Sequence, residues 1–160
     1  MLVELPHFSF PAYTSGAMLT RLPSVYYTKK VSDLEIKLIL QCIADAVGSN
    51  LSVHSGDRDF RPKGGAKRSL HMAHRAADIH AEGISDAVLF RTIKAEREKI
   101  FTSFIHRYQV LHHGKYTETE GEHVHIGDYQ FIKAVTMGPG ITFLIEGMTP
   151  KTKGVYSEVA

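Results

Sequence analysis

The densest group of reactive side chains lies in the segment SLHMAHRAADIH, residues 69–80. Its histidines and its aspartate offer imidazole nitrogens and a carboxylate, which are ligand types that zinc prefers. A catalytic zinc site has three protein ligands and leaves a fourth position for water. His71 and Asp78 are of the right chemical type, and the small Ala76 and Ala77 would let the backbone run close to an ion. The segment therefore indicates a zinc site that needs at least one further ligand.

A second group, His123 and His125, lies far along the chain. Residues two apart on a strand point to the same face of a sheet. One ring could therefore bind metal while the other hydrogen-bonds to the substrate or to the developing oxyanion. Glu122 precedes His125 by three residues, and a regular strand would point it to the opposite face. It can join the same site only if the chain twists or bulges just after Gly121.

The conformation of residues 69–78 has two interpretations. In a strand over 76–80, Asp78 faces one side of the sheet and needs a partner such as His125. In a helix, His71, His74 and Asp78 would share a face at i, i+3 and i+7 and would form a different ligand set. The pattern of residue types by itself leaves both geometries open.

The elements that must position these residues are short. Ser32-Asp33-Leu34-Glu35 is a capping box, and apolar residues follow it at helical spacing until Gly48. Ser85 can cap a second helix that runs through about Phe101. Alternating or apolar runs predict strands over 51–55, 76–80, 108–112, 123–127 and 141–145. The charged or glycine-containing segments 57–67 and 114–121 are predicted as loops.

The composition fits one globular domain. The chain has 160 residues, of which 43% are hydrophobic and 22% are charged, so a disordered chain and a fibrous repeat are both excluded. The formal net charge is only +2, and a nucleic-acid partner is therefore not expected. Cys42 is the single cysteine, which excludes an internal disulfide and a cysteine-based zinc site. No apolar run approaches the roughly 20 residues that span a bilayer, so stable membrane insertion is not expected.

The amino terminus, MLVELPHFSFPAY, lacks the basic start and the long apolar segment of a secretory signal. The protein is therefore expected to be made in the cytoplasm without a signal peptide. Any target outside the cytoplasm would be reached by another route, such as lysis or specialised secretion. A secretion machine and an immunity or inhibitor protein are the protein partners that such a route suggests.

Three blocks of residues occur together in a characteristic order. They are Ser55-Gly56-Asp57-Arg58, then Ser69-x-His71 with Ala76-x-Asp78, then Glu122-x-x-His125. The set resembles the zinc D-Ala-D-Ala carboxypeptidase and dipeptidase family. Relatives of that family include phage L-alanyl-D-glutamate endopeptidases and the hedgehog signalling domain.

The resemblance implies a role for each matching residue. It implies that His71, Asp78 and His125 bind zinc. It also implies that Glu122 is the general base and then the general acid, and that Arg58 holds the substrate carbonyl as negative charge develops on its oxygen. Zinc lowers the pKa of a bound water to about 7, so the implied reaction is amide hydrolysis.

Further residues at the predicted site need separate treatment. His123 is expected to assist catalysis, and Glu120 is the alternate for Glu122. His74 departs from the family, which usually has glycine there, and its ring could narrow the pocket, donate a hydrogen bond or compete as a ligand. Ser69 is expected to position its loop through its hydroxyl. Many relatives carry a tryptophan near the last ligand, whereas this chain has none.

These observations predict a single α+β domain in which an antiparallel sheet carries the zinc site and helices pack against it. The expected divisions are an irregular amino-terminal arm over 1–31, a core over 32–148 and a loose tail over 149–160. The expected function is zinc-dependent hydrolysis of peptide bonds in peptidoglycan stem peptides, as a carboxypeptidase or an endopeptidase. The alternatives are a zinc-bearing, non-catalytic binding module of the hedgehog type and a metal-free interaction domain.

Overall fold

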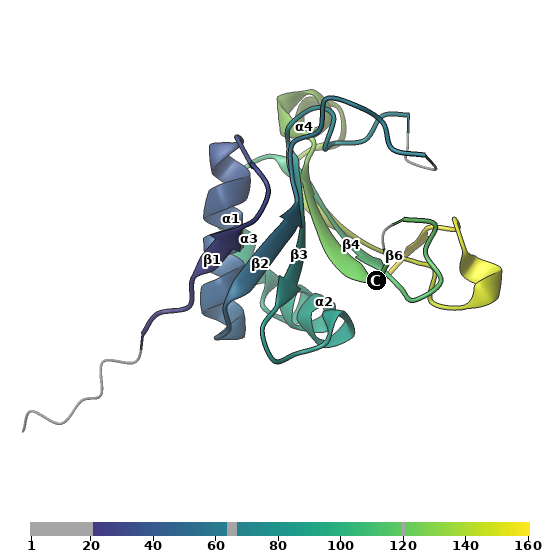
Figure 1. Ribbon diagram of the computed structural model, residues 1–160. Helices are drawn as coiled ribbons and strands as arrows, with labels where there is room; N and C mark the ends of the chain where they lie inside the picture. The colour runs from purple at the N-terminus through teal and green to yellow at the C-terminus, as the bar shows by residue number, and fades with distance from the viewer. Residues whose placement is uncertain (1–20, 64–66, 120) are drawn as a thin grey trace, which may run out of the picture.

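A seven-stranded sheet forms the centre of the structure, a computed structural model that describes residues 21–63, 67–119 and 121–160 (Figure 1). The strand order is β1-β2-β3-β5-β4-β6-β7. The strands are β1 Val25–Tyr27, β2 Leu51–Ser55, β3 Ala76–Ala81, β4 Arg107–His113, β5 His123–Asp128, β6 Gly140–Glu146 and β7 Ser157–Glu158. The pairs β1–β2 and β4–β6 are parallel, whereas the other neighbouring pairs are antiparallel. The predicted α+β fold is confirmed, and the sheet is mixed, with its antiparallel part at the centre.

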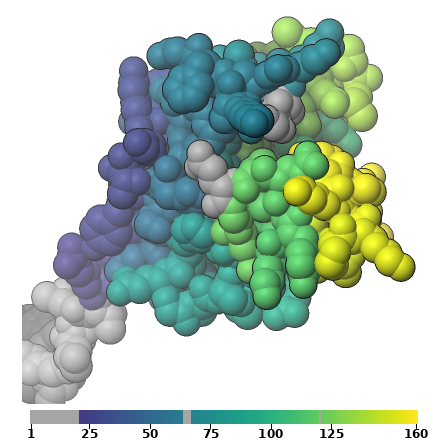
Figure 2. Space-filling view, turned by 45° about the vertical axis from the view of Figure 1, so that its right-hand side comes forward, coloured from purple at the N-terminus to yellow at the C-terminus, as the bar shows by residue number. Residues whose placement is uncertain are grey.

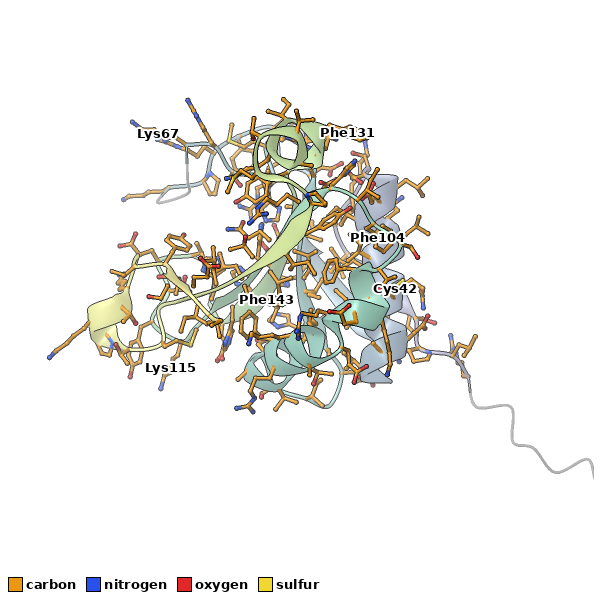
Figure 3. All side chains as sticks on the ribbon, turned by 180° about the vertical axis from the view of Figure 1, so that it is seen from behind. Cys42, Lys67, Phe104, Lys115, Phe131 and Phe143 are labelled. Atoms are coloured by element: carbon orange, nitrogen blue, oxygen red, sulfur yellow. The ribbon has the colours of Figure 1, made fainter. Side chains whose placement is uncertain are left out.

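Helices cover one face of this sheet. The helices are α1 Leu34–Val47, α2 Asp86–Ala95, α3 Arg97–Phe101 and α4 Gln130–Met137. The first three lie on the covered face, and α4 lies at one end of the sheet (Figure 1). Seen from behind, Cys42 and Phe104 mark the helical side, and the loops that carry Lys67 and Lys115 extend from the opposite side (Figure 3). We call that opposite side the loop face.

The first helix follows its sequence signals closely. The Asp33 carboxylate accepts a hydrogen bond from Ile36 N at 3.0 Å, so Asp33 is the N-cap of α1 rather than Ser32. Gly48 ends the helix in the left-handed conformation, with φ 70°. The predicted boundaries of α1 are therefore confirmed to within one residue.

The later helices differ from the prediction. Ser85 Oγ accepts a hydrogen bond from Val88 N at 3.3 Å and caps α2 as predicted. The helix predicted to reach Phe101 is interrupted at Glu96, so it is two helices, α2 and α3. Helix α4 was not predicted, because no side-chain cap marks its start. None of the helices in the described ranges has both the length and the apolar character needed to cross a bilayer.

The hydrophobic core lies between the helices and the sheet. Its fully buried side chains include Ile36, Ile39, Leu40 and Ile43 of α1, Leu89 and Ile93 of α2, and Val53, Ile79, Val110, Val124 and Ile126 of the strands. Each such side chain contributes about 1.5–3 kcal/mol when fully buried. Alternate residues of a strand point to opposite faces, so the burial of Val124 and Ile126 in the core sends His123 and His125 to the loop face.

The two ends of the described chain are more regular than predicted. Within the predicted irregular arm over 1–31, Val25–Tyr27 forms the edge strand β1 beside β2, and residues 1–20 lie outside the described residues. Within the predicted loose tail, Pro150–Thr152 is a 3₁₀ helix and β7 pairs with β6. Both segments are held by backbone hydrogen bonds to a neighbouring strand. Such bonds do not depend on the side chains, so a short irregular sequence does not predict them. The domain boundaries themselves stay a prediction.

Candidate metal centre

The side chains of His71, Asp78 and His125 meet on the loop face. His71 Nε2 lies 3.0 Å from Asp78 Oδ1 and 3.1 Å from His125 Nδ1. Asp78 Oδ1 and His125 Nδ1 lie 2.9 Å apart. The three atoms thus form a nearly equilateral triangle. Two ligands of a tetrahedral zinc lie about 3.3 Å apart, as follows from metal–ligand lengths of about 2.0–2.1 Å. The donor set and its spacing therefore fit zinc, and we call these residues the metal triad.

Two neighbouring strands and one loop position the metal triad. Asp78 of β3 is directly opposite His125 of β5 in the antiparallel register. His71 comes from the loop before β3, where Ser69 Oγ accepts a hydrogen bond from His71 N at 3.3 Å. Residues that are far apart in the sequence therefore meet because strand pairing and one loop bring them together.

The main chain of Gly56 orients the His71 ring. His71 Nδ1–H donates to the Gly56 carbonyl oxygen at 2.7 Å, which leaves Nε2 of the neutral ring unprotonated and aimed at the other ligand atoms. A Cβ atom at position 56 would lie 2.0 Å from Lys30 O, so only glycine fits there. The glycine of the Ser-Gly-x-Arg block thus allows close chain contact and presents the carbonyl that fixes a metal ligand.

Electrostatics keep the triad in the protonation states that bind a cation. Burial raises the pKa of Asp78, but its contacts with the His125 and His71 rings lower it well below its usual value. Burial also lowers the pKa of His125. A buried carboxylate beside a neutral imidazole is the combination that a divalent metal ion requires.

Arg58 lies beside the metal triad, as predicted. Its Nη2 donates a hydrogen bond to Ser55 Oγ at 2.5 Å and lies 3.5 Å from Asp78 Oδ2. The side chain is 20% exposed. The guanidinium is therefore held in place by Ser55 and Asp78 and still reaches the solvent beside the triad.

His123 is next to the triad on β5 and is not part of it. Its Nδ1–H donates to Gly121 O at 2.7 Å, and its Nε2 lies 3.6 Å from Asp78 Oδ1. Burial lowers the pKa of His123 to about 4, although the Asp78 carboxylate partly opposes this shift. The neutral ring therefore turns an unprotonated Nε2 toward the site.

Glu122 does not reach the triad, which corrects its expected position. Its carboxylate accepts a hydrogen bond from His112 Nε2 at 3.0 Å, and the His112 ring packs beside Phe90 of α2 on the helical face. Strand β5 begins in regular register, with His123 opposite His113, so it contains no bulge that would turn Glu122 around. Strand alternation therefore sends this carboxylate away from the loop face.

His74 also lies outside the triad. The segment 69–75 consists mainly of turns and β3 follows it, so the helical ligand set that includes His74 is wrong. His74 Nε2 lies 2.9 Å from Asp59 Oδ1, and the His74 side chain is 43% exposed. The backbone of His74 has φ 57°, a left-handed conformation that glycine adopts without strain. This conformation accounts for the glycine that relatives have at this position.

The triad lines a pocket of about 290 Å³. One wall comes from residues 58–63 and 69–71. The other comes from residues 118–119 of the β4–β5 loop and from Tyr156 of the carboxy-terminal segment, and a hollow separates these two lobes (Figure 2). The lining includes the cations Arg58 and Lys63 and the carboxylate of Glu118. Glu120, the predicted alternate for Glu122, lies outside the described residues.

Sequence analysis missed a histidine and a glutamate at this pocket. His113 of β4 lines it, and Glu146 of β6 accepts a hydrogen bond from His113 Nδ1 at 2.8 Å. The two residues are opposite each other in the parallel pairing of β4 with β6. No sequence signal links them, because that pairing joins strands that are not consecutive in the chain.

A second cluster of histidine and carboxylates lies away from the pocket. Glu35, His106 and Asp128 each offer one ligand atom, and these atoms lie within 4.8 Å of one another. His106 Nδ1 lies 3.0 Å from Asp128 Oδ2 and 3.2 Å from Glu35 Oε1. Asp128 Oδ1 also accepts a hydrogen bond from Gln130 N at 2.6 Å at the start of α4. We call these three residues the helix-junction cluster.

Comparison with known proteins agrees with this geometry. The family model of Peptidase M15 matches residues 21–113, which is more than half of the chain. No curated protein and no solved structure matches the chain. The matched segment includes Arg58, His71 and Asp78, and the fold adds His125 from outside it. The chain therefore belongs to the peptidase M15 family, the zinc metallopeptidases related to D-Ala-D-Ala carboxypeptidases and hedgehog domains.

Proposed function

We propose that this protein is a zinc-dependent peptidase that hydrolyses peptide bonds in bacterial peptidoglycan stem peptides. One observation carries the proposal: the ligand atoms of His71, Asp78 and His125 form a compact triangle that lines a pocket in a chain of the M15 family. Zinc held by these atoms would polarise a substrate carbonyl and supply a nucleophile at neutral pH. The remaining steps belong to the side chains around the triad.

The charge of the pocket supports a substrate with free carboxylates. Arg58 and Lys63 both line it. Stem peptides carry such carboxylates, and a cation in a partly enclosed site attracts them more strongly than it would in open water. Binding at these cations would place a peptide bond of the substrate over the triad.

Arg58 is suited to stabilise the developing oxyanion. Ser55 and Asp78 hold its guanidinium beside the triad before substrate arrives. A donor that is already in place needs no reorganisation when charge develops on the carbonyl oxygen, which is the usual source of this kind of stabilisation. His123 Nε2 is unprotonated, because Nδ1–H donates to Gly121 O, so this ring can accept a hydrogen bond from a donor of the substrate but cannot stabilise the oxyanion.

The β4–β5 connection supplies the candidates for the general base. Glu118 lines the pocket, whereas Glu122 matches the family motif but bonds His112 on the helical face. Glu118 already lies at the pocket that the triad lines. Glu122 can act only after the chain near Gly121 turns its side chain to the loop face.

The position of Glu122 also favours a second candidate function. A chain that holds zinc but directs its motif glutamate away from the site could be a zinc-bearing binding module without turnover. Such a module would bind stem peptides through the same cations and would release no product.

Digestion of purified sacculi tests both functions. Zinc-loaded wild-type protein is expected to release muropeptides that mass spectrometry identifies, and His71→Ala is expected to release none. Glu118→Gln and Glu122→Gln are compared at equal zinc content. The variant that loses more than about a hundredfold in rate identifies the base, since general acid–base catalysis contributes about 10²–10⁴-fold.

The result has clear alternatives. If zinc-loaded wild-type protein binds sacculi but releases nothing from them, the binding module is correct and the peptidase is rejected. If both glutamine variants retain full activity, neither glutamate is the base. If the protein neither binds nor cleaves sacculi, peptidoglycan is the wrong substrate.

A further inference from the structure

A hydrogen-bonded pair of buried side chains lies on the loop face, at the pocket that the metal triad lines. His113, at the end of β4, is 6% exposed, and Glu146, at the end of β6, is 2% exposed. His113 Nδ1 lies 2.8 Å from Glu146 Oε2. Because the two residues are opposite each other in the parallel register, both side chains stand on the loop face.

Glu146 is anchored from several directions. Its Oε1 accepts a hydrogen bond from Gly154 N at 2.6 Å, and its carbonyl oxygen accepts one from Gly114 N at 2.7 Å. Burial raises the pKa of Glu146, but hydrogen bonds from Thr117, His113 and the Gly154 N–H lower it below its ordinary value. The side chain is therefore a carboxylate that only accepts hydrogen bonds, and His113 Nδ1 must carry the proton between them.

The hydrogen bond between Glu146 and His113 Nδ1 determines the hydrogen-bonding role of His113 Nε2. The His113 ring packs against His123, with ring centroids 4.5 Å apart, and against the edge of Tyr156 at 6.2 Å. The ring lines the same pocket as the metal triad. Within the described ranges, His113 Nδ1 faces Thr117 Oγ1 and Glu146 Oε2, and Nε2 is the other polar atom of the ring. In a neutral ring that carries its proton on Nδ1, Nε2 is a hydrogen-bond acceptor.

The place of His113 excludes it from the metal triad. His113 is opposite His123 on the neighbouring strand, so one strand spacing of about 4.8 Å separates it from β5. If the scissile peptide bond of the substrate lies over the triad, the neighbouring residues of the peptide would lie over the loop face of β4. A peptide N–H enclosed there needs an acceptor, because a buried donor without a partner costs about 1–3 kcal/mol.

We propose that His113 is a substrate-binding residue whose Nε2 accepts a hydrogen bond from an amide N–H of the bound peptide, and that Glu146 is the positioning residue that fixes this ring. The inference rests on the proposed peptidase function and adds a contact to it. Lys63 binds an acidic group of the substrate and Arg58 binds the carbonyl oxygen of the scissile bond, whereas His113 binds a main-chain N–H. The pair therefore helps to set which peptide bond lies over the triad.

A synthetic stem pentapeptide that ends in D-Ala-D-Ala tests this inference. KM and kcat are measured if wild-type protein cleaves it, and Kd is measured by calorimetry if it does not. His113→Ala is expected to raise KM or Kd roughly tenfold, as loss of one hydrogen bond of about 1.4 kcal/mol would do. The value of kcat is expected to stay within about threefold, since this contact also exists in the ground state.

Variants separate positioning from simple structural support. Glu146→Gln lets the ring change tautomer, so it is expected to raise KM in the same direction by a smaller factor. The double variant is expected to be no weaker than His113→Ala, because the two residues act as one unit. His106→Gln is the matched control, since His106 also pairs with carboxylates but lies away from the pocket, and it is expected to leave KM unchanged.

A set of pentapeptides with one N-methylated amide each identifies the donor. For wild-type protein, KM or Kd is expected to rise roughly tenfold with one N-methylated peptide of the set. In His113→Ala, that peptide and the unmethylated one are expected to bind equally. Glu146→Gln carries the same test if His113→Ala does not fold. The inference is overturned, with the peptidase intact, if wild-type protein cleaves the peptide and both variants bind it as wild type does. If wild-type protein neither cleaves nor binds it, the proposed function fails and the inference fails with it.

Discussion

The metal triad and the helix-junction cluster contain the same kinds of side chain and differ in what surrounds them. Each holds histidine and carboxylate atoms within 4.8 Å of one another. The triad lines a pocket. In the helix-junction cluster, Asp128 receives a backbone N–H of α4, and the Tyr108 hydroxyl donates to Glu35. The lining of that pocket includes none of the cluster.

This difference shows why residue types alone do not identify a metal site. A buried carboxylate is stable when enough donors satisfy it, and a protein can supply these donors itself. Asp128 has the His106 ring and the Gln130 N–H as neighbours, so groups of the protein itself can satisfy this carboxylate. The triad instead directs an unprotonated His71 nitrogen toward a carboxylate and a second ring at the edge of a pocket.

The largest expected effect is on zinc content. His71→Ala is expected to weaken zinc binding by more than about a hundredfold, because even the partners of metal ligands contribute about 10–100-fold. His106→Ala is expected to keep one zinc per chain. Metal analysis after dialysis against a weak chelator measures both. Full zinc in His71→Ala, or its loss in His106→Ala, would reverse the assignment of the two clusters.

A smaller effect, on stability, is expected at the helix-junction cluster. Asp128→Asn removes a buried charge partner of His106 and weakens the start of α4, so it is expected to lower the free energy of unfolding by about 3 kcal/mol. Zinc affinity is expected to stay unchanged. Urea unfolding of the zinc-loaded protein measures the loss. A variant as stable as wild type would show that the cluster contributes nothing to the fold.

The smallest effect is expected at Gly127, which lies on β5 between the two clusters. A Cβ atom there would lie 2.5 Å from Leu70 Cδ1 and 3.1 Å from His125 Nε2. Gly127→Ala is therefore expected to shift the Leu70 side chain and the His125 ring and to cost about 1–2 kcal/mol. Zinc affinity should fall a few-fold while the helix-junction cluster is unaffected. Calorimetric titration measures the zinc affinity of Gly127→Ala. Unchanged zinc affinity would mean that Leu70, in the loop before β3, moves aside without shifting the His125 ring.

Local signals predicted the parts of the fold that carry them. Helix α1 was predicted from its cap, its apolar spacing and Gly48. The central strands were predicted from alternating residues. Helix α4 was missed because it is short and has no side-chain cap, and its apolar residues Phe131, Ile132 and Val135 are exposed instead of joining the core.

The candidate site divides in the same way. The ligand set of His71, Asp78 and His125 was predicted from the resemblance to the zinc carboxypeptidase family, because residue types and spacing alone left a helical set with His74 open. Glu122 was expected at the site, and this expected position was wrong, because β5 has no bulge and strand alternation sends the side chain to the helical face. His113 with Glu146 was not predicted, because the parallel pairing that joins them leaves no trace in either strand.

The sequence by itself determined the chemistry available to this protein, because the donor types, the helix caps and the strand alternation are all local properties. Only the tertiary structure decided which of these groups share a pocket. Strand register, the face of each side chain and the contact of loops with β6 depend on pairing between distant segments. Side chains of the same kinds therefore form two different sites along β5. His125 belongs to a candidate metal centre at a pocket, and Asp128 belongs to a hydrogen-bonded cluster away from it.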